Sequence, residues 1–107
     1  MKLGLVIYSN DAETVWNAFR FGSHAIKHHG NEVRVFLLGH GVEAESLDSE
    51  AFKVTDQMTQ FIANGGTILA CGTCLKLRQA GSSEMCPVST MNELHRLVAE
   101  CDKTLTF

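Results

Sequence analysis

The sequence lacks any concentration of basic residues. Nine lysines and arginines are scattered among twelve acidic residues, which gives the 107-residue chain a net charge of −3. Nucleic-acid binding depends on basic side chains that neutralise phosphates. We therefore expect no nucleic-acid partner.

Long apolar runs are also missing. No stretch approaches the roughly 20 residues that span a bilayer. The apolar stretch 1–8 is short, and no signal-peptide cleavage pattern follows it. We therefore expect a cytoplasmic protein with no membrane contact, whose four cysteines are reduced thiols rather than disulfides.

Several catalytic signatures are absent. The sequence contains no G-x-S-x-G, G-x-x-x-x-G-K-[ST], G-x-G-x-x-G or H-E-x-x-H motif. Hydrolase, nucleotide-binding and zinc-protease functions are therefore without support. A structural zinc site needs four ligands, and a second C-x-x-C or H-x-x-H pair is missing. We expect neither a metal nor a cofactor.

What the chain does have is the composition of one globular domain. Hydrophobic residues make up 45% and charged residues 20%, and a second core would not fit in this length. We expect a single domain over residues 1–107. The spacing of its apolar residues predicts strands at 3–8, 33–38, 67–70, near 87–88 and at 104–107. The predicted helices are 11–29, one around 54–62, a short one at 74–80, and 91–101 behind a Thr90–Glu93 capping box.

Strands that alternate with helices indicate βαβ units. The expected fold is therefore α/β, a three-layer α/β/α sandwich with a mostly parallel sheet of about five strands. Sites in such folds form beyond the carboxyl ends of the strands. Two segments lie there: the polar, glycine-rich stretch 39–46, which we expect to be a loop, and the stretch 71–74.

The segment Cys71-Gly72-Thr73-Cys74 is the sharpest feature of the sequence. It follows a predicted buried strand and opens a helical turn, where free backbone N–H groups favour a thiolate. Gly72 lets the backbone turn sharply or approach a ligand. Because the thiolate is the nucleophile, this placement predicts a reactive thiol at Cys71.

Other interpretations of the thiol pair stay open on the residues alone. Free cysteines are often buried and inert, so the pair can be structural. A C-x-x-C beside βαβ units is also the cue for a thioredoxin-like dithiol, although that motif follows the first strand rather than lying late in the domain. The remaining chemistry is sulfur transfer, in which one cysteine accepts a sulfane sulfur as a persulfide and passes it on.

Three segments resemble the DsrE/DsrF-like (YchN-like) family. Residues 68–74 followed by Arg78 are similar to its C-x-T-C…R signature, and residues 101–107 are similar to its ADKVLTF-like closing strand. The stretch Gly39-His40-Gly41-Val42 resembles the family's G-D-G-V or S-D-A-V loop. The spacing C-x6-R also matches the related sulfur-relay proteins DsrE and TusD, in which the cysteine is the sulfur acceptor.

The resemblance implies a homotrimer or homohexamer and gives the acceptor role to Cys71, with Cys74 beside it as a second catalytic thiol. The residues implied to support them or bind substrate are His40, Gly72, Thr73 and Arg78. Two positions depart from the family pattern. His40 stands where many relatives have aspartate, and Gln79 stands where glycine usually follows the arginine.

The expected function is that of a small intracellular sulfur-relay protein that accepts and transfers sulfane sulfur on Cys71. Its partners would be sulfur donor and acceptor proteins and further copies of itself. The donor, the acceptor, the pathway and catalytic turnover as a sulfurtransferase are not specified by the sequence. The alternative function is a non-catalytic small-molecule-binding or assembly module with structural thiols.

The other two cysteines are weaker candidates for a functional role. Cys86 lies near a predicted strand end, where it can face the same cleft as Cys71 but is expected to be a buried filler or a secondary thiol. Cys101 falls on the apolar stripe of the last helix and is expected in the core.

The first helix carries two further features. His24 and His28 have the i, i+4 spacing of metal ligands, but they lie opposite the apolar stripe and are expected on the surface. Trp16 and Arg20 share a face off that stripe, which would suit a subunit interface.

Overall fold

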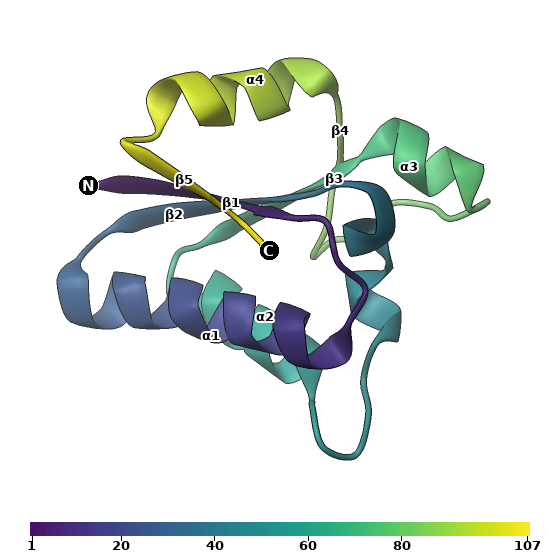
Figure 1. The fold of residues 1–107 in the computed structure, drawn as a ribbon, viewed down its shortest axis with the longest axis horizontal. Helices are drawn as coiled ribbons and strands as arrows, with labels where there is room; N and C mark the ends of the chain where they lie inside the picture. Colours follow the sequence, from purple (N-terminus) through teal and green to yellow (C-terminus); the bar gives the residue numbers. More distant parts are fainter.

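The apolar runs of the sequence form the inner strands of a five-stranded sheet, and the computed structural model describes all of residues 1–107 (Figure 1). The strands are β1 (Lys2–Ile7), β2 (Glu32–Leu37), β3 (Thr67–Cys71), β4 (Val88–Ser89) and β5 (Lys103–Thr106). Their order is β4-β3-β2-β1-β5, and every neighbouring pair is parallel. The expected parallel-dominated α/β sheet is confirmed.

Helices cover both faces of this sheet. They are α1 (Ala12–His29), the 3-10 helix η1 (Gly39–Ser46), α2 (Val54–Ala63), α3 (Gly72–Leu77) and α4 (Met91–Glu100). Figure 1 shows α1 and α2 on one face and α4 on the other, with α3 beyond the end of β3. The three-layer arrangement is as expected. None of these helices is both long enough and apolar enough to cross a membrane.

The longest helix, α1, begins and ends where the sequence predicts. The Asp11 side chain accepts the backbone N–H of Thr14 at the first turn, and Gly30 ends the helix in the left-handed conformation with φ of 65°. Its buried side packs on α2 and the sheet, where Phe19 and Phe61 meet edge to face at 5.6 Å. This face holds the larger of the two hydrophobic clusters.

The smaller cluster lies under α4, and here the predicted buried stripe is only partly realised. Leu97 is buried, whereas Met91 is 60% and Val98 is 54% exposed. Leu97 sits directly over Gly4, where a Cβ atom would lie 2.3 Å from Leu97 Cδ2. Leu94 and Cys101 are half-buried against the same cluster, so the middle of the predicted stripe is covered and Met91 and Val98 are not.

The start of α4 also differs from the prediction. Thr90 occupies the N-cap position, but its side chain makes no capping hydrogen bond. Glu93 instead accepts a hydrogen bond from Arg96 at 3.0 Å. The predicted capping box is therefore wrong, because the acidic side chain turns outward to a basic neighbour one turn along the helix.

The carboxyl ends of the strands carry two elements that the sequence placed imprecisely. Residues 39–46, predicted to be a loop, form η1, and α3 begins at Gly72 directly after β3 rather than at residue 74. Close packing explains η1: a Cβ at Gly41 would lie 1.9 Å from the carbonyl oxygen of Ile7, so glycine alone lets this turn rest on the end of β1. Ile7 pairs with Leu37, and Leu37 with Ala70, so β1, β2 and β3 end at one edge.

Candidate thiol site

Cys71 is the last residue of β3 and the N-cap of α3. Its Sγ accepts the backbone N–H of Cys74 at 3.4 Å, so the expected contact with the start of the helix is present. The side chain is nevertheless only 4% exposed, and it belongs to the cluster formed with Val6, Phe36 and Leu97. The thiol therefore has a helix N–H donor, but it is shielded from solvent.

Cys74 lies one turn further along α3 and is half-buried. Its Sγ accepts the backbone N–H of Gly39 at 3.2 Å, a donor from η1 that the sequence did not indicate. Burial raises the pKa of the Cys74 thiol, and its contact with Cys71 raises this pKa further, while the Gly39 N–H and the Arg78 charge lower it. Both thiols are free, and Cys74 packs against the hydrophobic cluster that contains Cys71.

Arg78 ends α3 and joins it to η1. Its Nη1 donates to the carbonyl oxygen of Cys74 at 3.1 Å, and its Nε donates to Glu43 Oε2 at 2.9 Å. The hydrogen bond from Arg78, followed by one from His40, holds the pKa of Glu43 below its usual value. The guanidinium is thus fixed against the helix that carries both cysteines.

His40 belongs to the same polar cluster but does not reach a sulfur. Its Nδ1 lies 3.3 Å from Glu43 Oε2 and 3.2 Å from Arg78 Nη2, and its side chain is 60% exposed. Its contacts are therefore with the groups that position Arg78. A direct hydrogen bond from this imidazole to either thiol does not occur.

The two residues between the cysteines differ in their surroundings. Gly72 is the first residue of α3, and a Cβ there would lie 2.9 Å from Val88 Cγ2 and 3.1 Å from the carbonyl oxygen of Ser89. Its missing side chain therefore lets α3 start against β4. Thr73 is exposed.

Gln79, which follows Arg78 in place of the family's glycine, has φ of 53°. This is the left-handed region that glycine enters without steric cost. This conformation explains why glycine suits the position. In this chain glutamine adopts the same backbone conformation.

Two contributors to the site were not found from the sequence. Glu43 links Arg78 and His40, and Gly39 donates to Cys74. A helical assignment for 39–46 would have placed His40 and Glu43 on one face, three residues apart, but the glycine content of the segment hid that periodicity. The contacts with α3 bridge 35 positions of sequence and carry no local signal.

Cys86 does not share the surroundings of Cys71. It is buried in the hydrophobic cluster of the other sheet face, as expected for a filler, and the shared cleft considered from the sequence is not formed. Burial, with the charge of Glu45 as the next cause, raises the pKa of Cys86 to about 12. Its neighbourhood includes a cavity of about 370 Å³ that Arg78 and Glu43 also line.

Of the other residues considered from the sequence, only Cys101 lies near the thiol pair. Cys101 is half-buried and packs against the cluster that contains Cys71. His24 and His28 are exposed, as predicted, with ring centroids 4.6 Å apart. No group of three or more histidine, cysteine or acidic side chains is arranged to hold a metal ion. Trp16 packs edge to face on Phe52 of the same chain at 5.3 Å, so much of its apolar surface is used internally.

Fold and site together define an α/β protein with a thiol pair and a fixed arginine at the carboxyl edge of a parallel sheet. Comparison with protein families gives the more specific result: the DsrE/DsrF-like family matches residues 1–107, and the chain belongs to this family. The family is associated with sulfur relay. Comparison with curated proteins finds no match.

Solved structures share the fold at low sequence identity. The ychN protein from E. coli superposes with a TM-score of 0.82 at 20% identity, covering 100% of both chains. The conserved protein of unknown function BT1422 from Bacteroides thetaiotaomicron gives a TM-score of 0.78 at 18% identity, covering 99% of this chain and 94% of its own. The likeness establishes the arrangement of the sheet and helices.

Proposed function

We propose that this chain is a sulfur-relay protein in which Cys71 accepts a sulfane sulfur as a persulfide. The observation that carries the proposal is the position of Cys71 at the junction of β3 and α3, where its Sγ accepts the Cys74 N–H at 3.4 Å. A backbone donor at the start of a helix stabilises negative charge on the sulfur that it contacts. Membership of the DsrE/DsrF-like family supports the same chemistry.

The transfer is a pair of displacements at sulfur. The Cys71 thiolate attacks the outer sulfur of a donor persulfide, a new S–S bond forms, the donor S–S bond breaks, and the donor leaves as a thiolate. An acceptor thiolate then attacks the outer sulfur on Cys71 and releases the Cys71 thiolate. The sulfane sulfur moves without any external oxidant or reductant.

Cys74 has a second role in this scheme because it lies one helical turn from Cys71 and packs against the same cluster. Attack of its thiolate on the inner sulfur of the Cys71 persulfide would form a Cys71–Cys74 disulfide and expel hydrosulfide. The raised pKa of Cys74 keeps this thiol protonated at neutral pH and makes the side reaction slow. The loaded state is thereby protected.

Arg78, Glu43 and His40 act as positioning residues. Arg78 binds the Cys74 carbonyl and is itself held by Glu43, so the polar cluster fixes the helix turn that presents its N–H to Cys71. Thr73 and His40 are exposed beside these groups, where a donor or acceptor protein would approach.

A second candidate function is a binding or assembly module with structural thiols. The burial of Cys71 against Val6, Phe36 and Leu97 favours it, because a thiol that is 4% exposed meets a donor only after local opening. The two candidates differ in whether Cys71 takes up sulfur under native conditions.

The deciding experiment is loading with inorganic polysulfide, followed by intact mass at neutral pH. Wild type should gain the mass of one sulfur atom, and Cys71→Ser should lose at least about tenfold in loading rate. Cys74→Ser should load and retain the sulfur longer. Cys101→Ser, a half-buried cysteine outside the pair, is the matched control and should behave as wild type.

Two outcomes would contradict the proposal. Loading on Cys74 alone would show that the acceptor role belongs to the other thiol. Loading no faster than that of a model thiol would favour the binding module.

A further inference from the structure

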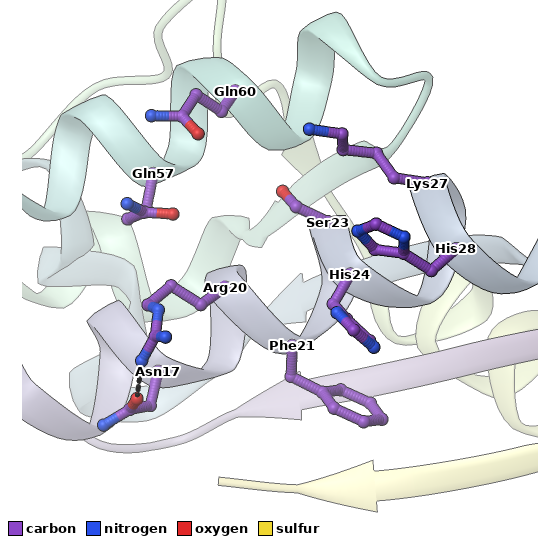
Figure 2. Close-up of a pocket in the computed structure, with 9 residues that line it drawn as sticks. All are labelled: Asn17, Arg20, Phe21, Ser23, His24, Lys27, His28, Gln57 and Gln60. Atoms are coloured by element: carbon purple, nitrogen blue, oxygen red, sulfur yellow. Dashed lines mark hydrogen bonds between the residues drawn. The ribbon is translucent and has the colours of Figure 1, made fainter.

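A polar groove lies between α1 and α2, and none of its lining residues belongs to the thiol site (Figure 2). Its volume is about 490 Å³. Four basic side chains of α1 line it at positions i, i+4, i+7 and i+8 of the helix: Arg20, His24, Lys27 and His28. This spacing places them along one stripe of the helix surface.

The groove contains no carboxylate. The remaining polar side chains of the lining are three amides and one hydroxyl: Asn17, Gln57, Gln60 and Ser23. None of the basic side chains is engaged in an ion pair. In a chain of net charge −3, this is a local excess of positive charge without internal compensation.

Arg20 is held in place by contacts within the chain. Its guanidinium carbon lies 4.4 Å from the ring centroid of Trp16, and its Nη1 donates to Asn17 Oδ1 at 3.0 Å. Trp16 is in turn packed on Phe52. A guanidinium has five N–H donors, and only one of these makes a hydrogen bond to the protein. The other donors are available at little cost in side-chain entropy.

Ser23 supplies an independent observation at the same groove. The residue is 8% exposed, and its Oγ has no hydrogen-bond partner. Figure 2 shows this oxygen directed from α1 toward the space between the two helices. Buried hydroxyl groups are normally satisfied, so an unpartnered one in the wall of a cationic groove points to a missing acceptor.

We propose that this groove binds a small molecule that bears a phosphate group. A phosphate dianion matches the fork of Arg20 and the ammonium group of Lys27, and it supplies acceptor oxygens for the Ser23 hydroxyl. The volume exceeds that of one phosphate, so an organic portion would lie along the amides of Gln57 and Gln60 on α2. The site is separate from sulfur transfer.

The test is a calorimetric titration of the full chain with inorganic phosphate and with adenosine monophosphate. Both probes should bind saturably, and the nucleotide should bind more tightly. Arg20→Gln/Lys27→Gln should weaken binding at least about tenfold. The control Lys53→Gln/Lys76→Gln removes two exposed charges outside the groove and should stay within about twofold of wild type.

Several results would overturn the proposal. The proposal is wrong if neither probe binds saturably, or if both double variants weaken probe binding equally. It is also wrong if the protein binds only to vesicles that contain phosphatidic acid. If the double variant fails to fold, Lys27→Gln alone decides, because Lys27 is exposed. Cys71→Ser should bind both probes as wild type does, which separates this site from the sulfur-relay proposal.

Discussion

Among single residues, Glu43 links the two elements that meet at the thiol site. It accepts hydrogen bonds from Arg78 at 2.9 Å and from Asn10 at 3.5 Å, and it lies 3.3 Å from His40. Arg78 has no other carboxylate partner. Removing the charge of Glu43 therefore releases the arginine from η1 while leaving the arginine itself intact.

Glu43→Gln should slow persulfide loading of Cys71 several-fold and reduce the acid sensitivity of the fold. Arg78 and then His40 lower the pKa of Glu43, so its stabilising contribution is present above the unfolded pKa and is lost as the pH falls through the folded pKa. Thermal unfolding from about pH 7 to about pH 3 measures this. Glu50→Gln, at an exposed site without a partner, should follow the wild-type curve. Parallel curves for all three proteins would show that the ion pair makes no contribution to stability.

Cys86 gives a prediction at alkaline pH. Burial, followed by Glu45, raises its pKa from 9.0 to about 12 in the folded chain. The unfolded chain therefore loses this proton first, and stability should fall as the pH rises from about 9 toward about 12, by at most about 1.4 kcal/mol per pH unit. Cys86→Ala should make that slope shallower, even though it lowers stability at neutral pH. Part of the slope should remain, because burial also raises the pKa of the Cys74 and Cys101 thiols. Urea unfolding at several alkaline pH values tests this, and an unchanged slope in the variant would contradict it.

The critical contact between elements is that of η1 with the end of β1. At Gly41 a Cβ would lie 1.9 Å from the Ile7 carbonyl oxygen, which is backbone and cannot rotate away. Gly41→Ala should therefore displace η1 and destabilise the fold by about 3 kcal/mol. The displacement moves Gly39 away from Cys74, so persulfide loading should change as well.

Gly81→Ala is the matched control for this variant. Nothing lies within 4 Å of a Cβ at Gly81, so its free energy of unfolding should stay within about 0.5 kcal/mol of wild type. Urea unfolding of both variants gives the comparison. If Gly41→Ala lowers the free energy of unfolding no more than Gly81→Ala does, then η1 tolerates the movement and the prediction is wrong.

At the scale of the whole molecule, several exposed apolar side chains bear on whether copies of the chain associate with one another. Three successive elements expose large apolar side chains: Leu77 of α3 is 77% exposed, Val88 of β4 is 58% exposed, and Met91 of α4 is 60% exposed. Exposed apolar surface of this kind is typical of protein interfaces. We propose that the chain forms a homo-oligomer through this surface, with a trimer or hexamer implied by the family resemblance.

Light scattering at micromolar concentration should give a mass above that of one chain. Leu77→Glu/Met91→Glu should shift the protein to the monomer, because the new charges oppose burial. Ile62→Glu, at an apolar residue of α2 that is 38% exposed, should leave the assembly intact. A monomer mass for wild type would rule out the oligomer, and dissociation only by Ile62→Glu would place the interface elsewhere.

The sequence by itself determined the strands, the longer helices and the position of the thiol pair, although it did not predict η1. Apolar spacing identified the five strands and the two long helices of the larger core, because period two and period 3.6 are properties of the local backbone. The same local logic placed Cys71 at the junction of a strand and a helix, where its Sγ receives an N–H.

The tertiary structure decided how these pieces meet. The sequence could not reveal that Glu43 reaches Arg78, or that Gly39 reaches Cys74, because these contacts arise only when β1, β2 and β3 end in register. Nor could it show how much of an apolar stripe is covered. Periodicity tells which face of α4 is apolar, but packing over Gly4 buries Leu97 and leaves Met91 in solvent. Burial depends on what lies opposite a side chain, and that depends on the arrangement of distant segments.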